Sequence, residues 1–448
     1  MASGDGVKKR AAWVADLERD LAGATAESEF AIWKSHSVHR VPAAVKALHP
    51  HAYRPQVVSL GPFHHADPRL LPMESHKRRA VARLVARCSG TTSSSAALDQ
   101  LVAAMMRTAE VYAAAGGGGG GGDDGEYKQR DPVFGRHGKV YMVPYVRRDM
   151  LIVDNQLPLL VLEKLVAVER RIYSQTMKVG VEYQVKKMVL RFISPSCKSP
   201  PPAKDEHRAL HPLDVFRKSL LSDKKPRDGA GTITSRRHHD HNEDDEASSI
   251  IRSASELYEA GIRFKRSKTD SLHDISFRHG VLSLPSIIVD DSTEYMFLNL
   301  MAFERLHAGS GGGNDVTAYV FFMDNIIDSA ADVALLTSKG IIQNAVGSDK
   351  AVASLFNGLA KDVVLDTDSE LDAVQRMVNR YCRKPCNMWR ANLVHTYFRS
   401  PWAFLSLAAA LFLLAMAVLQ TVYTVLSFYR DNGGGTISSS PPSAPAPR

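Results

Sequence analysis

One uncharged stretch near the C-terminus decides how this chain is organised: Pro401-Trp-Ala-Phe-Leu-Ser-Leu-Ala-Ala-Ala-Leu-Phe-Leu-Leu-Ala-Met-Ala-Val-Leu-Gln-Thr-Val-Tyr-Thr-Val-Leu-Ser-Phe-Tyr429. A bilayer core about 30 Å thick takes roughly 20 apolar residues as a helix, because a helix satisfies its backbone polar groups internally. Aromatic residues at both ends, such as Trp402 and Phe428, are typical of the membrane interface. We predict a transmembrane helix over residues 401–429, with a buried core helix as the alternative.

This helix is expected to present two kinds of surface. Bulky side chains are expected to form the membrane span itself: Trp402, Leu411, Leu414, Val418, Val425 and Phe428. Small or polar residues recur at alternating steps of three and four, and they define a candidate helix-pairing face: Ala403, Ser406, Ala410, Ala417, Gln420 and Thr424. Pairing through this face would make a homo-oligomer. The alternative is a chance pattern, because such residues are ordinary in membrane spans.

Basic residues before the span predict its direction. Four of them are expected to lie near anionic lipid head groups: Arg383, Lys384, Arg390 and Arg399. The positive-inside rule then keeps the bulk of the chain in the cytosol, with the plasma membrane favoured over an endomembrane. The first twenty residues are charged and lack the apolar core of a signal peptide. Cys382 and Cys386, beside the membrane, are either palmitoylation sites or ordinary thiols.

Length and composition bound the rest of the chain. With 448 residues, 44% of them hydrophobic, it can form one large or two ordinary domains. A formal net charge of +8 is compatible with nucleic-acid binding, but the sequence has no basic strand interleaved with aromatic residues and no recognition helix. We therefore expect lipid rather than nucleic acid as the anionic partner.

The domain plan has four parts. Residues 1–27 form an amphipathic segment, 28–398 an α-rich cytosolic domain, 401–429 the span, and 430–448 a disordered tail. Flexible insertions are expected at about 116–125 and 197–249. The first is a run of seven glycines followed by Asp123 and Asp124, whose carboxylates would repel a phosphate that a P-loop binds through lysine. The second contains a histidine cluster without rigid ligand geometry. No cofactor and no metal are expected.

Local patterns predict a mainly α fold with a few short strands (α+β). A β-branched run between prolines predicts a short strand within residues 53–65. Pro158 should kink or restart a helix over residues 146–169. Further helices are predicted over 73–88, 98–115, 302–306, 316–328 and 331–338, with a helix start at Ser253 and a last helix after the acidic residues 366–372. The segment 280–291 predicts a hairpin or two short strands.

Several motifs occur in an order that identifies a family. They are His39-Arg-Val-Pro42, Val58-Ser-Leu-Gly-Pro-Phe-His-His65, Met73-Glu-Ser-His-Lys77, Asp154-Asn-Gln-Leu-Pro158, Glu256-Leu-Tyr-Glu-Ala-Gly261, Asp290-Asp-Ser-Thr-Glu294, Asn299-Leu-Met-Ala-Phe-Glu304 and Pro401-Trp402. Nearly the whole chain resembles the plant domain-of-unknown-function family two-four-seven. The resemblance implies a plant membrane protein with a helical globular region and one C-terminal span. Some members are associated with self-incompatibility recognition in grasses. The chain departs from the family at the two insertions and at Asp154, where many members have Glu.

Two functions follow as hypotheses. The first is a membrane-anchored protein-interaction component in recognition or signalling, with no enzymatic activity. The alternative is a membrane-tethered enzyme whose site includes His64, His65 and His76, with Glu74 nearby. Adjacent histidines on a strand point to opposite faces, so at most one of His64 and His65 would enter such a site. A structural role for these residues, closing a turn against the helix that starts near Met73, is favoured.

Overall fold

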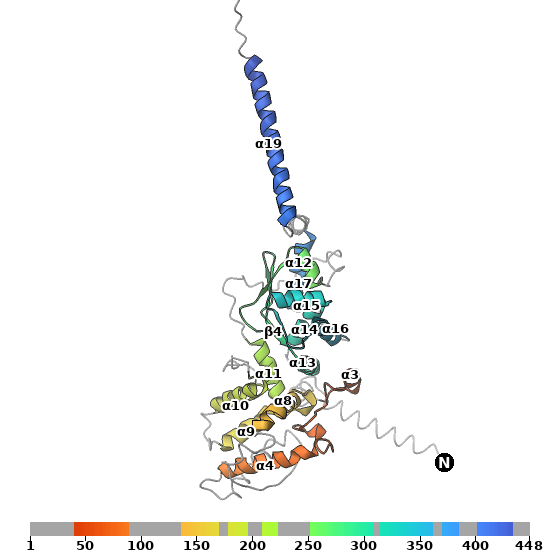
Figure 1. The fold of residues 1–448 in the computed structure, drawn as a ribbon. Coiled ribbons are helices and arrows are strands. Elements are labelled where there is room, and N and C mark those ends of the chain that lie inside the picture. The colour runs from red at the N-terminus through yellow and green to blue at the C-terminus, as the bar shows by residue number, and fades with distance from the viewer. Residues whose placement is uncertain are drawn as a thin grey trace, which may run out of the picture. The chain divides into compact units, whose positions relative to one another are not determined.

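A computed structural model of the chain describes residues 40–88, 136–169, 178–195, 208–222, 251–307, 313–361, 370–384 and 401–432. These residues are mainly helical with a few short strands, as predicted (Figure 1). They divide into two compact units, one with the residues up to Ser255 and Arg263–Asn379, the other with Glu256–Ile262 and the residues from Arg380. The predictions for 1–27, 98–125 and the tail beyond 432 lie outside the described residues.

The first unit begins with short helices separated by turns. The elements are α3 (Ala43–Leu48), η1 (Pro62–His64), α4 (Leu71–Cys88), α7 (Arg136–Tyr141), α8 (Val143–Met150), η2 (Val153–Asn155) and α9 (Leu159–Glu169). Pro158 separates η2 from α9, so the predicted restart of the helix is confirmed. α9 packs between α4 and α10 (Lys178–Ile193), and Figure 1 shows the three helices in that order.

The strand predicted within residues 53–65 is wrong. The segment consists of turns and ends in η1. Its backbone N–H groups do not pair with another strand. Those of Val57, Val58 and Leu60 donate instead to the side chains of Asp149 and Asn155. An extended run of β-branched residues can therefore be satisfied by polar side chains when no partner strand lies beside it.

A buried helix lies inside the range that was predicted as a flexible insertion. α11 spans Pro212–Leu221 and packs on α10. It begins in a defined way, because His211 accepts a hydrogen bond from the Asp214 N–H and Pro212 occupies the first turn. Leu213 is fully buried. The prediction of one insertion over 197–249 is wrong for this helix, while residues 197–207 and 223–249 lie outside the described part.

Two small sheets follow. β1 (Arg263–Arg266), β2 (Ser276–Arg278) and β3 (Val281–Leu284) form a three-stranded sheet in the order β1-β3-β2. β4 (Ile287–Val289) pairs in parallel with β5 (Ile342–Asn344). The two short strands predicted within 280–291 are therefore β3 and β4, and they belong to different sheets.

Helices complete the first unit. They are α13 (Thr293–His307), α14 (Asp315–Ile326), α15 (Ala330–Ser338) and α16 (Asp349–Leu359), and they cover the three helices predicted in this region. Ser329 and Asp332 form a capping box at the start of α15, and Gly340, with a φ of 69°, follows its end. The fully buried Tyr319, Phe322 and Phe356 place the core between α14 and α16, which pack together.

Three further helices complete the described chain. They are α12 (Ala254–Glu259), which starts directly after Ser253 as predicted, α17 (Glu370–Arg383) and α19 (Pro401–Asn432). α17 carries Val374 and Val378 on a buried face, as their spacing predicted. α19 covers the whole uncharged stretch (Figure 1).

Candidate functional site

Polar side chains gather in the core where α8, η2 and α13 meet the segment before α4. Five of them define what we call the polar junction: Asp149, Asp154, Asn155, Gln156 and Asn299. All five are at most 1% exposed. Buried polar groups cost free energy unless they form hydrogen bonds, so the partners of these side chains decide what the junction does.

Asp149 organises the segment after α3. One of its carboxylate oxygens accepts the Gln56 N–H at 2.8 Å, and the other accepts those of Val57 and Val58 at 2.7 and 2.8 Å. Burial raises the pKa of Asp149, and the three backbone donors oppose that rise. The carboxylate thus takes the place of a neighbouring strand.

Asn155 extends the same arrangement by one turn. Its side-chain oxygen accepts the N–H groups of Leu60 and Gly61, and its amide donates to the carbonyls of Val58 and Asp149. Gly61 approaches η2 so closely that an added Cβ would lie 2.8 Å from the carbonyl oxygen of Gln156. The close approach requires glycine at this position.

Gln156 and Asn299 tie more distant parts of the chain to the junction. Gln156 donates to the carbonyls of Met150 and Ile152 and accepts the Leu213 N–H of α11 at 3.1 Å. Asn299 accepts the Val153 N–H and donates to the Ala52 and Tyr295 carbonyls. Chain segments separated by more than 200 residues therefore share one hydrogen-bonded core.

Asp154 connects the junction to α3. Its carboxylate accepts the Val41 N–H at 2.6 Å and forms an ion pair with Lys46. Both carboxylate oxygens of Asp154 therefore have a partner.

A second buried ion pair lies on α11 and α13. Glu304 accepts from the Arg217 Nε at 2.7 Å and also from the backbone N–H groups of Val316 and Thr317 at the start of α14. Negative charge is favourable at a helix N-terminus. The pair holds α11, α13 and α14 together in the same way that Asp149 holds residues 56–58.

The candidate catalytic residues have different surroundings and partners. His64 is half-buried, and its Nε2 has no hydrogen-bond partner among the described residues. Burial lowers the pKa of His64, and the carboxylate of Asp154 opposes that change. His65 is exposed, whereas His76 contacts Arg79 of its own helix and Glu74 contacts Lys77.

Lys77 explains what this region does in the fold. Its Nζ donates to the Ser59 carbonyl at 2.7 Å and so fastens α4 to the preceding turn. Met73 packs against Val58 in the same place. These contacts hold α4 against the preceding turn, while the structural role that the sequence favours for His64, His65 and His76 stays a prediction.

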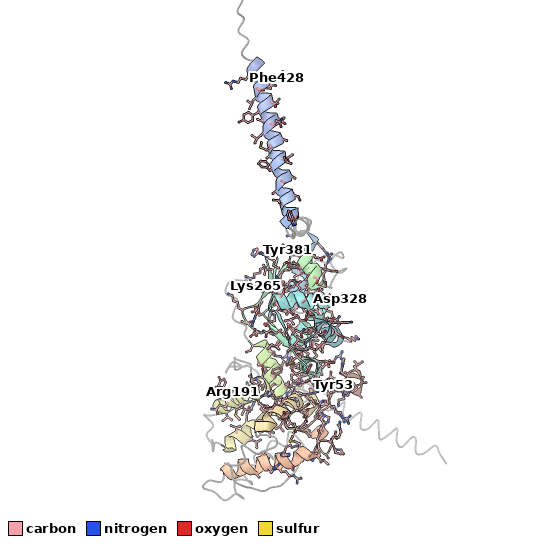
Figure 2. The ribbon with its side chains drawn as sticks, in the orientation of Figure 1. Tyr53, Arg191, Lys265, Asp328, Tyr381 and Phe428 are labelled. Carbon is pink, nitrogen blue, oxygen red and sulfur yellow. The ribbon has the colours of Figure 1, made fainter. Side chains whose placement is uncertain are left out.

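The apolar surface of α19 is the second candidate site. Residues 405–430 are long and apolar enough to cross a membrane, and no part of that window is buried. All six predicted span residues are exposed: Trp402, Leu411, Leu414, Val418, Val425 and Phe428. Figure 2 labels Phe428 near the far end of α19. Of the predicted pairing face, Ser406, Ala410, Ala417, Gln420 and Thr424 are exposed, and the side chain of Ala403 is outside the described set.

The residues predicted beside the membrane are only partly described. Arg383 and Lys384 are exposed at the end of α17, whereas Arg390, Arg399 and Cys386 lie outside the described residues. Cys382 is 4% exposed. Its thiol is therefore poorly placed for the palmitoylation that was one of its two interpretations.

Comparison with known proteins now decides the family. The model of DUF247, described as a plant protein of unknown function, matches residues 38–115 and 113–416. The chain belongs to the DUF247 family. The match includes the polar junction and the first part of the apolar stretch of α19, up to Met416, so the polar junction lies within the family region and the rest of α19 lies beyond it.

Two Arabidopsis thaliana proteins are similar to this DUF247 protein. UPF0481 protein At3g47200 is 28% identical over 442 residues, which cover 91% of this chain and 90% of the relative. Putative UPF0481 protein At3g02645 is 34% identical over 187 residues, which cover 41% of this chain and 35% of the relative. No solved structure matches the chain.

Four of the eight motifs quoted for the family resemblance meet in the first unit. Each of these four motifs contributes groups that are hydrogen-bonded in the polar junction, namely Val41, residues 58–61, residues 154–156 and Asn299. The sequence alone missed Asp149 and Arg217, which stand outside those motifs. Asp149 directly follows Arg147 and Arg148, so no local signal distinguished it, and its buried role could be recognised only in the folded chain.

Proposed function

We propose that this DUF247 protein is a single-pass membrane protein whose globular part faces the cytosol and acts by binding other proteins in recognition or signalling. One observation carries the proposal. The window 405–430 of α19 is long and apolar enough to cross a membrane and has no part buried in the protein. An exposed apolar surface of this length is unfavourable in water and favourable in a bilayer.

The charges before α19 support the proposed orientation. Arg383 and Lys384 at the end of α17 are exposed, and Arg390 and Arg399 follow before the apolar stretch begins. A basic flank on one side of a span is retained in the cytosol. The same residues would contact anionic head groups, which favours the plasma membrane as the location.

The polar junction supports binding rather than catalysis. Its carboxylates and amides are engaged with backbone N–H and carbonyl groups or with Lys46. Such hydrogen bonds position segments of the chain inside the protein, so binding to partners would take place on its surface. A histidine-dependent enzyme with His64 and His65 is the weaker alternative. Its one support is the buried Nε2 of His64, which has no hydrogen-bond partner among the described residues.

Proximity labelling in plant cells tests the proposed role. A biotin ligase fused to the N-terminus of the full chain should label a reproducible group of membrane-associated proteins. The matched control is the full chain with Leu414→Arg and Val418→Arg, which should not insert. Identical labelled groups from the two chains would contradict the proposal, because the membrane would then not determine the partners.

The candidate pairing face gives a separate prediction. Replacing Ala410 and Ala417 with Leu should weaken association between copies of the span, because close approach of two backbones needs small side chains. Gln420→Leu should also weaken the free energy of association, by on the order of 0.6 to 2 kcal/mol, because an interhelical hydrogen bond is lost. A membrane two-hybrid reporter carrying residues 401–432 measures the association. Leu411→Ala with Val418→Ala is the control, and equal losses from both faces would show that the pairing face makes no contact.

A further inference from the structure

The three-stranded sheet has one face that carries cations. In its register, Arg263 of β1 and Arg278 of β2 flank Val281 of β3, and Lys265 lies beside Ser283 in the neighbouring row. Side chains alternate between the two faces of a sheet, so these residues share one face. Phe264 lies between Arg263 and Lys265 on β1, and Leu282 lies between Val281 and Ser283 on β3. Both are buried on the opposite face.

These cations have no neutralising partner among the residues that the structure describes. Arg263, Lys265 and Arg278 are exposed, and within the described residues none of them forms an ion pair with a carboxylate. Figure 2 labels Lys265. Arg266 at the end of β1 differs, because it pairs with Asp270 at 3.1 Å. The face therefore presents three cations beside the side chains of Ser276 and Ser283. We call these five residues the basic face.

The spacing of the basic face suits a surface with repeated negative charges. Neighbouring strands lie about 4.8 Å apart, which separates Arg263 from Arg278 by roughly 10 Å at the backbone. Alternate residues along a strand are about 7 Å apart, as are Arg263 and Lys265. Three cations spread over a sheet can each meet a different anion.

The membrane proposed above determines which anionic surface the basic face binds. Sixteen residues, 385–400, connect the end of the described α17 segment to α19. Even fully extended, such a connection spans at most about 60 Å. A tether of this length keeps the bilayer surface at high effective concentration relative to any soluble anion. Each basic residue near an anionic leaflet raises association roughly fivefold.

We propose that the basic face docks on the anionic phospholipid head groups of the bilayer that α19 enters. The contacting residues are Arg263, Lys265, Ser276, Arg278 and Ser283. This proposal rests on the proposed function, because it needs α19 in a membrane. It assigns a lipid-binding role to a sheet that none of the sequence motifs pointed to.

Amine labelling of Lys265 tests the proposal. The full-length protein is reconstituted into nanodiscs of phosphatidylcholine alone or of phosphatidylcholine with phosphatidylserine, and the acetylation rate of Lys265 is followed by mass spectrometry. Phosphatidylserine should slow that rate roughly fivefold or more, and high salt should restore it, because screening weakens the attraction. Lys350 on α16 is exposed and serves as the internal control, with an unchanged rate.

Matched variants separate docking from general charge. Arg263→Ser with Arg278→Ser should return the labelling of Lys265 to its rate in neutral discs. Lys187→Ser with Arg191→Ser removes two exposed cations from α10 and should leave the protection of Lys265 intact.

Equal labelling rates of Lys265 in neutral and anionic discs, for protein that has incorporated, would overturn the docking proposal alone. Failure to incorporate into either disc would overturn the membrane anchor as well. Protection in neutral discs by an added polyglutamate peptide, without protection by phosphatidylserine, would assign the face to an acidic protein instead.

Discussion

Replacing Asp149 with alanine should lower the free energy of unfolding by about 3 to 5 kcal/mol, because three buried backbone N–H groups lose their acceptor together. The carboxylate accepts from Gln56, Val57 and Val58, and the turn they belong to has no strand beside it to supply another acceptor. In a domain of this size we expect the thermal midpoint to fall by about 5 to 10 °C. Thermal unfolding of the full-length protein in detergent, followed by circular dichroism, measures the shift.

Two control variants make this result specific to the buried contact. Asp149→Asn keeps one acceptor oxygen, so its midpoint should lie between those of the wild type and the alanine variant. Asp291→Ala removes an exposed carboxylate of the same kind and should change stability by less than about 0.5 kcal/mol. If Asp149→Ala unfolds at the wild-type temperature, the polar junction does not hold residues 56–58 in place.

The second large effect concerns the apolar surface of α19. Changing Leu414 and Val418 to Arg together should raise the cost of insertion by about 6 to 8 kcal/mol, because both positions lie near the middle of the apolar window. The wild-type protein should remain in the membrane pellet after alkaline carbonate extraction, and the double variant should move to the supernatant.

The control variant changes the same two residues to alanine, which removes side-chain bulk without adding charge. Leu414→Ala with Val418→Ala stays compatible with a bilayer core and should remain in the pellet. Release of the wild-type protein by carbonate would mean that α19 covers its apolar surface with something other than lipid. A double Arg variant that still resists extraction would place the two residues outside the hydrocarbon core.

Elements with a strong local signal could be predicted from the sequence. α19 follows from its uncharged length, α4 from its helical pattern, and the restart before α9 from Pro158. In each case the information lies within one turn or one run of residues. Local chemistry is enough to decide such elements, because they satisfy their own backbone hydrogen bonds.

Elements that depend on distant partners could not be predicted in this way. The run around Val57 and Val58 has the composition of a strand, but its hydrogen-bond partner is Asp149, more than 90 residues away. α11 was missed because the charged and proline-rich sequence around it masks one short helix that is buried against α10. The strands β1 and β5 are three or four residues long and carry polar residues, so periodicity does not identify them.

The same limit applies to the polar junction. Asn155, Gln156 and Asn299 were visible as parts of family motifs, yet their role depends on backbone groups from residues 52–61 and 213. The sequence placed candidate chemistry at His64 and His65 instead, because histidines are the residues that usually carry it. Their surroundings, with Lys77 fastening α4 to Ser59, could be recognised only in the folded chain.

Glycosylation mapping tests the central claim, a span by α19 with the globular part in the cytosol, most directly. The chain has no native Asn-x-Ser/Thr site, so an added Asn-Gly-Thr tag on a spacer is the only acceptor. A tag at the C-terminus, translated into microsomes, should gain one glycan that endoglycosidase removes, and the same tag at the N-terminus should gain none. A glycan on the N-terminal tag, or none on either tag, would contradict the account.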